Sequence, residues 1–257
     1  MRHRRPDGSV WVRTYPLTLP RDHTEPCHAH EWDQLTYAAS GVIEIDTDEG
    51  VWVVPPHRAV WVPAGVAHGE RMYAPVSVRM LYFAEGIAHS LPRECRMVNV
   101  SSLLRELILH ISRVGALDRR RPAHAHVIGV LLDQLSALSN VPLQLPMPRD
   151  PRAARVASLL RERPDHAASL AALAREVGAS RRTIERSFVR DTHMTAGEWR
   201  RRARLLHAVR RLAEGEAVTN VALEAGYSSV SAFIAVFKKT FGMTPARSVA
   251  RGASLPA

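Results

Sequence analysis

Apolar and polar residues alternate in short runs over residues 10–85. The runs at 11–19, 41–56 and 58–65 carry apolar side chains at about every second position, and Gly, Pro and Asp separate them. A period of two is that of a β-strand, because successive side chains of a strand point to opposite faces. Short strands in series predict a β-sandwich or a β-barrel.

The period becomes helical from residue 101 onward. The recurring positions are Leu103, Leu104, Leu107, Ile108 and Ile111, followed by Val127, Val130, Leu131, Gln134 and Leu138. Gly115 and Pro122 lie between the two groups and favour a break in helical structure. We therefore expect two helices within residues 101–140.

A proline-rich stretch at residues 141–151 contains four prolines, a composition that favours a semi-rigid linker. The pattern after this stretch is helical from Arg152 to about residue 251. The chain is therefore expected to have an α+β fold with a β-rich segment at 1–100, a helical segment at 101–140, a linker at 141–151 and a helical domain at 152–251.

The helical domain contains an internal repeat, at residues 173–190 and 223–242. In each copy an alanine is followed four residues later by a glycine and two residues after that by a serine. These residues are Ala174, Gly178 and Ser180 in the first copy, and Ala222, Gly226 and Ser228 in the second. A glycine in the left-handed conformation ends a helix, and a serine caps the next one. The repeat predicts two helix-turn-helix units in tandem.

The basic residues are concentrated in the same half of the chain. Residues 150–257 contain 19 basic and 10 acidic residues, a net charge of +9, whereas residues 1–100 contain 10 basic and 12 acidic residues, a net charge of −2. A basic helix-turn-helix domain is typical of nucleic-acid binding. The arginines of the helix predicted at 197–215 either face phosphates or only solubilise that helix.

Several classes of protein do not fit this sequence. No apolar run reaches the ~18 residues that would suggest a membrane span, and no apolar targeting segment follows the basic N-terminus. The chain contains two cysteines, Cys27 and Cys95, which are too few for a disulfide framework. We expect a cytoplasmic protein with reduced thiols and no membrane partner.

Residues 150–250 resemble the DNA-binding domain of the AraC/XylS family of transcription regulators, most closely over residues 221–245. The resemblance implies two helix-turn-helix units joined by a long helix, which enter successive major grooves of double-stranded DNA. The residues that it implies at the DNA are Arg181, Arg182, Glu185, Arg186 and Arg190 in the first unit, and Ser229, Val230, Ser231, Ile234, Lys238 and Lys239 in the second.

The two units are expected to contribute differently to DNA recognition. Arginine can bind guanine through two hydrogen bonds, and glutamate can accept one from cytosine, so the first unit carries most of the sequence discrimination. In the second unit Ala235 stands where the family usually has an arginine. That unit is expected to dock mainly through phosphate contacts of Lys238 and Lys239.

The stretch CHAHEWDQ at residues 27–34 contains two histidines one residue apart and then a glutamine. If the stretch is a strand, alternation places His28, His30 and Gln34 on one face. With PAGVAH at 63–68, it resembles the two motifs of the cupin barrel, H-x-H-x3-E-x6-G and P-x-G-x2-H, with Gln34 in place of the usual glutamate. The resemblance implies a metal site formed by His28, His30, Gln34 and His68.

Three imidazoles suit Ni, Zn, Cu or Fe(II). Residues 55–68 also resemble a subgroup that contains regulators of exporter genes, which favours nickel. The alternative is a sensory cupin that has lost its metal and binds a metabolite, with Trp32, Trp52 and Trp61 as further candidates for lining that pocket.

Three functions are compatible with these features. The first is a ligand-responsive transcription regulator, not an enzyme, that forms a homodimer through residues 101–140 and for which RNA polymerase is a further partner. The second is a metal-dependent cupin enzyme fused to a DNA-binding tail, which the missing glutamate disfavours. The third is a constitutive DNA-binding protein whose barrel serves only for dimerisation.

Overall fold

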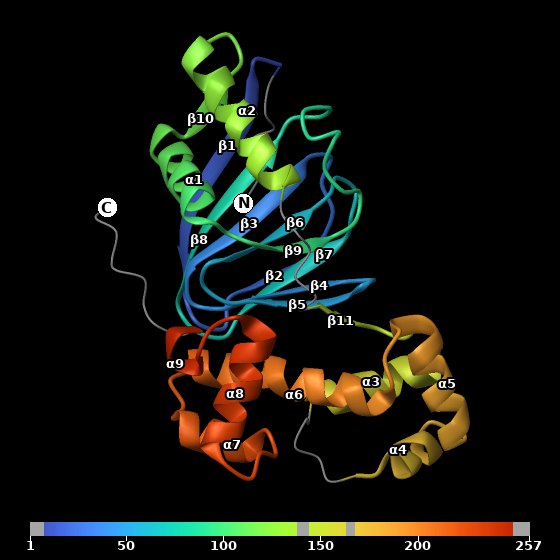
Figure 1. Ribbon diagram of the computed structural model, residues 1–257. Helices are drawn as coiled ribbons and strands as arrows, with labels where there is room; N and C mark the ends of the chain where they lie inside the picture. Colours follow the sequence, from blue (N-terminus) through green and yellow to red (C-terminus); the bar gives the residue numbers. More distant parts are fainter. Residues whose placement is uncertain (1–7, 138–143, 163–167, 249–257) are drawn as a thin grey trace. The chain divides into compact units, whose positions relative to one another are not determined.

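Residues 8–137, 144–162 and 168–248 are described by a computed structural model of the chain (Figure 1). The chain is a mixed α+β protein, as expected, with a sheet-rich N-terminal part and a helical C-terminal part. Its contacts define two compact units, of which the second contains Leu143–Val249 together with Asp48–Val53.

The strands form two antiparallel sheets. One sheet has the order β10 (Ala116–Asp118), β1 (Val10–Leu19), β8 (Val76–Phe83), β3 (Asp33–Ser40), β6 (Arg58–Val62) and β9 (Arg96–Asn99). The other has the order β11 (Gln144–Pro146), β5 (Gly50–Val54), β4 (Ile43–Thr47), β7 (His68–Met72) and β2 (Thr24–His28). Among the strands that the structure describes, no pairing joins the two sheets.

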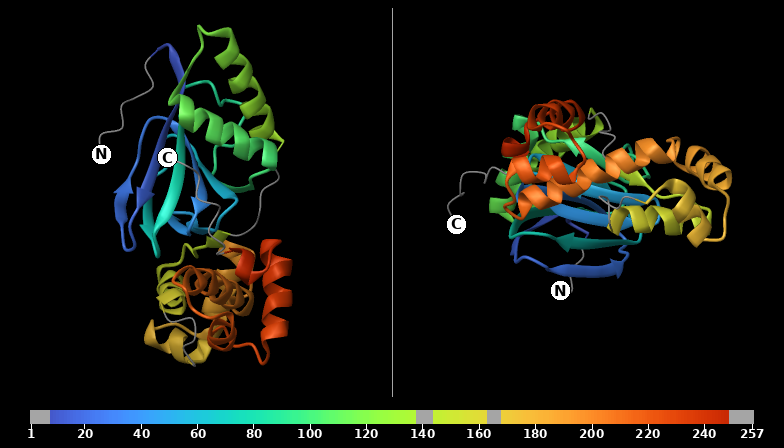
Figure 2. Two further views of the ribbon diagram at one scale, coloured as in Figure 1. Left: turned by 90° about the vertical axis from the view of Figure 1, so that its left-hand side faces the viewer. Right: turned by 90° about the horizontal axis from the view of Figure 1, so that it is seen from below.

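Two helices, α1 (Ser102–Val114) and α2 (Pro122–Ser136), cover one face of the six-stranded sheet (Figures 1 and 2). Their buried side chains share a core with the sheet; this core includes Leu35, Trp61, Phe83, Leu104, Ile108, Ile128 and Leu131. The helical cover explains why β6 is buried along its whole length instead of alternating between buried and exposed positions. A strand between two layers has no face in water.

The expected apolar stripes of α1 and α2 are partly wrong. Leu103 is 52% exposed and Val130 is 42% exposed, whereas Ile128 and Leu135 are buried. The predicted break between the helices contains strand β10, which pairs with β1. Leu138 lies outside the described residues.

The second unit contains seven helices among its described residues. They are α3 (Pro151–Glu162), α4 (Leu170–Glu176), α5 (Arg181–Thr192), α6 (Ala196–Ala213), α7 (Val218–Glu224), α8 (Val230–Phe241) and α9 (Pro245–Ser248). Trp199 on α6 is fully buried and packs edge-to-face against Phe188 on α5, with ring centroids 5.6 Å apart. Phe233, Phe237 and Phe241 form the buried face of α8.

The stretch predicted as a linker contains strand β11, which pairs with β5. Two side chains of α6 hold this strand: Trp199 Nε1 donates a hydrogen bond to the Pro146 carbonyl oxygen at 2.7 Å, and an Arg202 guanidinium nitrogen donates to the Gln144 carbonyl oxygen at 3.1 Å. Residues 144–146 are therefore part of a packed structure. Residues 141–143 of the predicted linker lie outside the described residues.

The turns of the repeat have the predicted backbone. Gly178 and Gly226 adopt left-handed φ angles of 66° and 82°, and Ser180 accepts a hydrogen bond from the Thr183 N–H at the start of α5. The predicted cap at Ser228 is wrong. Ser229 caps α8 by accepting from the Ala232 N–H, so this turn is one residue longer than the alignment of the two copies implies.

No helix in residues 8–137, 144–162 and 168–248 combines the length and the apolarity that a membrane span requires.

Candidate functional site

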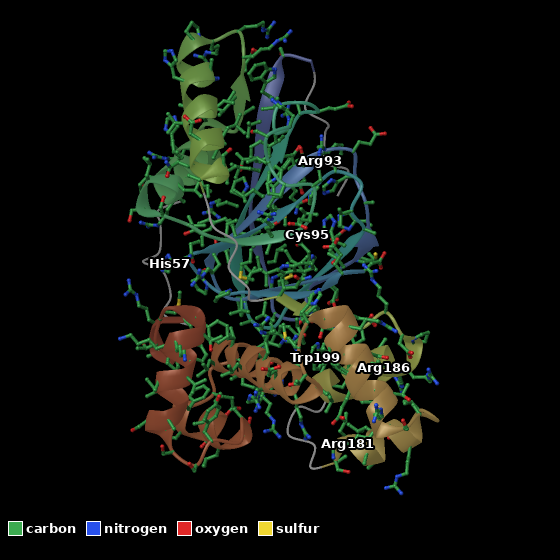
Figure 3. All side chains as sticks on the ribbon, turned by 45° about the vertical axis from the view of Figure 1, so that its right-hand side comes forward. His57, Arg93, Cys95, Arg181, Arg186 and Trp199 are labelled. Carbon is green, nitrogen blue, oxygen red and sulfur yellow. The ribbon has the colours of Figure 1, made fainter. Side chains whose placement is uncertain are left out.

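Helix α5 displays arginines on its outer surface (Figure 3). Arg181 donates a hydrogen bond from Nε to Glu185 Oε1 at 2.8 Å, an ion pair one turn apart on the helix. Arg182 and Arg186 are exposed, and within the described residues they form no ion pair. Among the described residues, therefore, Arg182 and Arg186 have no carboxylate partner, while Arg181 and Glu185 bind each other.

Arg190 has a different neighbour from the other arginines of α5. Its Nε lies 2.6 Å from Asp191 Oδ1, and Asp191 Oδ2 accepts a hydrogen bond from the Arg149 N–H at 3.0 Å. The Arg190 guanidinium, and then the backbone N–H groups of Arg149 and Asp150, lower the pKa of Asp191 to about 2. Arg190 thus takes part in fixing the start of α3.

Helix α8 presents a less polar surface than α5. Ser229, Ser231, Lys238 and Lys239 are exposed, whereas Val230 and Ile234 are half-buried. The two lysines lie in the last turn of the helix. All of these residues were predicted at the DNA, and the structure places none of them in the core.

The arginines of α6 serve mainly the interior of the second unit. Arg200 donates to the Ala168 carbonyl oxygen at 3.1 Å, and Arg211 forms ion pairs with Glu214, Glu216 and Glu224. Arg210 is buried, and burial lowers its pKa to about 10. Most of this helix's positive charge is therefore engaged within the unit, and only part of it can face phosphates.

In the first compact unit, whose described residues are 8–47 and 54–137, His28, His30 and His68 lie together. One ring nitrogen from each of the three lies within 4.8 Å of the others. His28 at the end of β2 is opposite His68 at the start of β7 in the antiparallel pairing of these strands. Their ring centroids are 4.5 Å apart, and that of His30 is 5.1 Å from that of His68.

The expectation that one strand carries His28, His30 and Gln34 is wrong. His30 lies in the connection between β2 and β3, and Gln34 belongs to β3 in the other sheet. The three side chains meet because the chain crosses from one sheet to the other between them. The predicted ligands therefore come together through the tertiary fold, and not through alternation along one strand.

Each of the three imidazoles is oriented by a backbone carbonyl. The Nδ1 atoms of His28, His30 and His68 donate to the carbonyl oxygens of Pro26, Trp32 and Val66, at 2.9, 2.7 and 3.0 Å. A carbonyl oxygen only accepts hydrogen bonds, so Nδ1 carries a proton in all three rings. In the neutral form Nε2 keeps its lone pair, and at His30 this lone pair faces another acceptor, Gln34 Oε1, at 2.7 Å, so that contact requires a cation or a proton between the two atoms. This hydrogen-bonding pattern is the one that orients histidines toward a metal.

The Nε2 atom of His68 is buried and has no hydrogen-bond partner within the described residues. Burial lowers the pKa of His68 to about 4, and burial likewise lowers the pKa of His30. The ring of His68 is therefore neutral at pH 7, which is the form that binds metal ions. A buried nitrogen lone pair without a partner is unfavourable unless a cation or a proton donor reaches it.

Gln34 and Glu70 form the polar side of this cluster. Gln34 Oε1 lies 2.7 Å from His30 Nε2, and Gln34 Nε2 donates to Thr36 Oγ1 at 2.6 Å and to Glu70 Oε1 at 3.4 Å. Burial, and then the charge of Glu25, raise the pKa of Glu70 to about 7. Sequence reasoning missed Glu70, although its place two residues after His68 on a strand puts both on one face.

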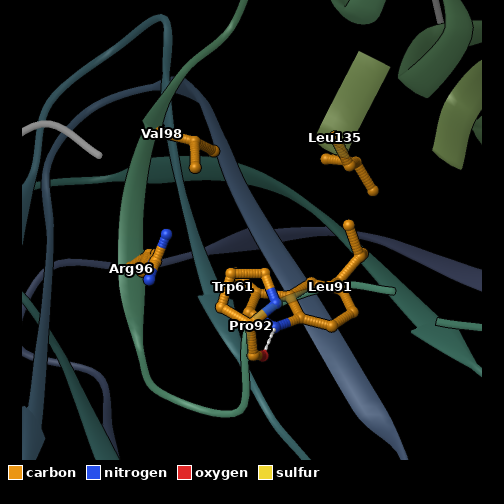
Figure 4. Close-up of a pocket in the computed structure, with 6 residues that line it drawn as sticks. All are labelled: Trp61, Leu91, Pro92, Arg96, Val98 and Leu135. Atoms are coloured by element: carbon orange, nitrogen blue, oxygen red, sulfur yellow. Dashed lines mark hydrogen bonds between the residues drawn. The ribbon is translucent and has the colours of Figure 1, made fainter. Parts of the chain in front are cut away.

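Of the three tryptophans considered for a ligand pocket, Trp32 alone packs on these histidines. Its ring stacks on His30 with centroids 5.1 Å apart. Trp52 is buried in β5. Trp61 lines a separate, largely apolar pocket with Leu91, Pro92, Arg96, Val98 and Leu135 (Figure 4), where its Nε1 donates to the Pro92 carbonyl oxygen at 2.9 Å.

The chain is similar to known regulators of transcription. A family model described as a helix-turn-helix domain matches residues 173–251. The HTH-type transcriptional regulator NimR of Escherichia coli is 34% identical over 228 residues, which cover 89% of this chain and 83% of NimR. RipA of Corynebacterium glutamicum is 35% identical over 101 residues, or 39% of this chain and 30% of RipA.

Among solved structures, ToxT of Vibrio cholerae with a bound unsaturated fatty acid aligns over 99% of this chain and 100% of its own, at 13% identity and a TM-score of 0.40. A regulator from Chromobacterium violaceum with an AraC-type DNA-binding domain aligns over 41% of this chain and 96% of its own, at 25% identity and a TM-score of 0.38.

A helix-turn-helix domain on a basic helical unit defines a DNA-binding transcription regulator. The identity to NimR over most of both chains shows that this chain belongs to the AraC family of such regulators. The relatives are transcription regulators, which confirms the expectation that the chain is not an enzyme.

Proposed function

We propose that this regulator responds to a divalent transition metal bound in a cupin-type first unit by His28, His30 and His68, with Gln34 as a fourth, neutral ligand. The observation that carries the proposal is the convergence of three imidazoles whose Nδ1 atoms are all hydrogen-bonded to carbonyls, together with the unpartnered Nε2 of His68.

The donor set narrows the choice of metal. Three imidazoles and one amide oxygen suit Ni, Zn, Cu or Fe(II), and they suit Ca or Mg poorly, because those ions prefer oxygen ligands. The residues that would hold the metal come from both sheets: His28 and His68 belong to paired strands of one sheet, and Gln34 belongs to the other. The metal would supply positive charge at this position. Nickel is the first metal to test, on the basis of the sequence resemblance of residues 55–68.

We further propose that α4–α5 and α7–α8 are two helix-turn-helix units, with α5 and α8 as recognition helices. The left-handed glycines and the serine caps at both turns support this. Arg182 and Arg186 supply most base discrimination, and Lys238 and Lys239 bind phosphates. RNA polymerase is a further partner in this proposal.

The regulator is proposed to act as a homodimer through α1 and α2. Leu103, Val114 and Val130 on these helices are large apolar side chains exposed to solvent, and such side chains at a surface favour association. Metal binding changes DNA affinity to the extent that it favours one of two states of the dimer.

The test is DNA binding with and without metal. Operator fragments are selected from genomic DNA by footprinting with the full chain, purified without an affinity tag. Their affinity is then measured in chelator and with added Ni, Zn, Cu or Fe(II). We expect one of these metals to change the affinity of the wild-type protein, and His30→Ala to abolish that change.

The matched control is His89→Ala, which removes an exposed histidine that lies outside the cluster and outside α1 and α2. This variant should respond to metal like the wild-type protein. A His30→Ala protein that is folded and still responds would contradict the three-histidine site, and a wild-type protein that ignores all four metals would contradict metal sensing altogether.

A further inference from the structure

Glu70 is a buried carboxylate beside the histidine cluster. It lies on β7 two residues after His68, and only 5% of its surface is exposed. Within the described residues Glu70 forms no ion pair, and its hydrogen-bond contact is the one with Gln34 Nε2 at 3.4 Å. A buried negative charge without a nearby positive charge is unfavourable. The Glu70 carboxyl group nevertheless lies beside a set of proposed ligands that contains no negative charge.

Glu70 and Thr36 together favour one orientation of the Gln34 amide. A carboxylate only accepts hydrogen bonds, so it favours the amide orientation that turns Nε2 toward it. Thr36 Oγ1 lies on the same side and also accepts from Nε2, at 2.6 Å. The amide oxygen is then left facing His30 Nε2, at 2.7 Å. Glu70 therefore keeps an oxygen, and not an N–H group, directed into the cluster.

The charges are complementary as well. Three neutral imidazoles and a neutral amide leave the double charge of a divalent cation without compensation, since Gln34 occupies the motif position where a glutamate is usual. Glu70 comes from the opposite sheet, and it contacts Gln34 in the interior between the two sheets. The carboxyl group of Glu70, which can supply the negative charge missing at position 34, is thus in contact with the Gln34 side chain.

We propose that Glu70 is a positioning residue of the metal site: it orients the Gln34 amide oxygen toward the metal and supplies the negative charge that the motif has lost. The ligand is a divalent transition cation, and this inference rests on the proposed metal site. Outer carboxylates that act through a ligand typically change metal affinity 10–100-fold, by order of magnitude.

The experiment compares metal affinity and stability in Glu70→Gln, which keeps the shape of the side chain and removes its charge. Co²⁺ and Ni²⁺ are titrated into the metal-free full chain and followed by calorimetry and by the visible absorption of bound Co²⁺. We expect binding to weaken about 10–100-fold and the Co²⁺ spectrum to change. The melting temperature of the metal-free protein should stay equal or rise, because the glutamine amide has the same shape and needs no buried charge.

A matched control and a rescue variant separate this role from a structural one. Glu44→Gln alters another buried carboxylate of the same sheet, which accepts from the Tyr73 hydroxyl, and it should leave metal affinity unchanged. The double variant Gln34→Glu with Glu70→Gln returns the carboxylate to the motif position, and it should recover the wild-type affinity or exceed it.

The outcomes are distinguishable. Wild-type protein that binds neither ion overturns the metal site and this inference together. Wild-type binding with equal affinity in Glu70→Gln overturns the role of Glu70 alone. A Glu70→Gln protein that loses both metal affinity and metal-free stability, without recovery in the double variant, assigns Glu70 a structural role and also overturns the proposal.

Discussion

Arginines on α5 have the same chemistry but different neighbours. Arg181 is paired with Glu185 and Arg190 with Asp191, whereas Arg182 and Arg186 are exposed and form no ion pair among the residues described. A guanidinium already bound to a carboxylate must give up that partner before it binds a base. At this scale, therefore, Arg182 and Arg186 are the first residues to test for base reading.

Replacing Arg186 with alanine should weaken specific DNA binding by ~1–3 kcal/mol and relax base choice at one operator position, because the two hydrogen bonds to guanine are lost. The measurement is the affinity for operator fragments with each base at each position. An equal loss for operator and unrelated DNA would assign Arg186 to a phosphate contact instead.

The helices of the second unit depend on hydrogen bonds at their ends. Ser229 accepts from the Ala232 N–H at the start of α8, and Thr195 with Glu198 forms a capping box at the start of α6. Asp191 accepts backbone N–H groups at the entry to α3 from a position about 40 residues further along the chain. At the scale of the element, the second unit is held partly by these polar contacts at the ends of its helices.

Ser229→Ala should lower the free energy of unfolding of the second unit by about 1 kcal/mol, because one N–H group of α8 loses its acceptor. Ser228→Ala is the control. It changes the neighbouring exposed serine, which is not the cap, and should stay within about 0.5 kcal/mol of wild type. Urea denaturation of both variants checks the pair, and equal losses would contradict the cap assignment.

Asp191→Asn should destabilise the protein at pH 7 by about 1–2 kcal/mol, because a charged acceptor bound to Arg190 and to two N–H groups becomes neutral. The pKa of Asp191 is about 2 in the folded chain and about 3.9 in an unfolded one. Its stabilisation is therefore present above about pH 4 and is lost as the pH falls toward 2.

Unfolding free energies of the wild-type and Asp191→Asn proteins, measured from pH 7 down to the lowest pH at which both still fold, should converge as the pH drops below about 4. A difference that stays constant over this range would show that the carboxylate charge does not contribute.

For the whole molecule, the excess positive charge belongs to the DNA-binding half, with a net +9 over residues 150–257. The structure shows that many of the arginines on α6 are bound within their own unit, so fewer charges face DNA than the sequence count suggests. Salt dependence of DNA binding reports the charges that do contact phosphates.

Lys238→Ala should weaken binding to all DNA sequences and reduce the slope of log affinity against log salt concentration by about 0.9, the value for one phosphate contact. Binding titrations at several salt concentrations give this slope. An unchanged slope would remove Lys238 from the interface.

Val130→Asp should weaken the proposed homodimer by at least about tenfold, because a charge replaces an exposed apolar side chain of the proposed contact. Sedimentation at several protein concentrations measures the effect. Leu223→Asp is the control, since Leu223 is also an exposed apolar residue but lies on α7. A similar loss in both variants would argue against an interface on α1 and α2.

The sequence alone determined the features that depend on residues close together in the chain. Helical periods, the left-handed glycines at 178 and 226, the cap at Ser180 and the histidine motifs are all local patterns, because helix ends and turns involve only a few consecutive residues. The motifs also sufficed to recognise the AraC family.

Only the tertiary structure decided which polar groups become partners. Glu70 meets Gln34 across 36 positions of sequence and from the opposite sheet, and β11 is held by α6 through contacts more than 50 residues apart. Strand register and sheet order determine which distant residues come into contact, and a short sequence pattern contains neither kind of information. At Ser228 and Ser229 the structure differs from the pattern of the first copy, because the turn before α8 is one residue longer.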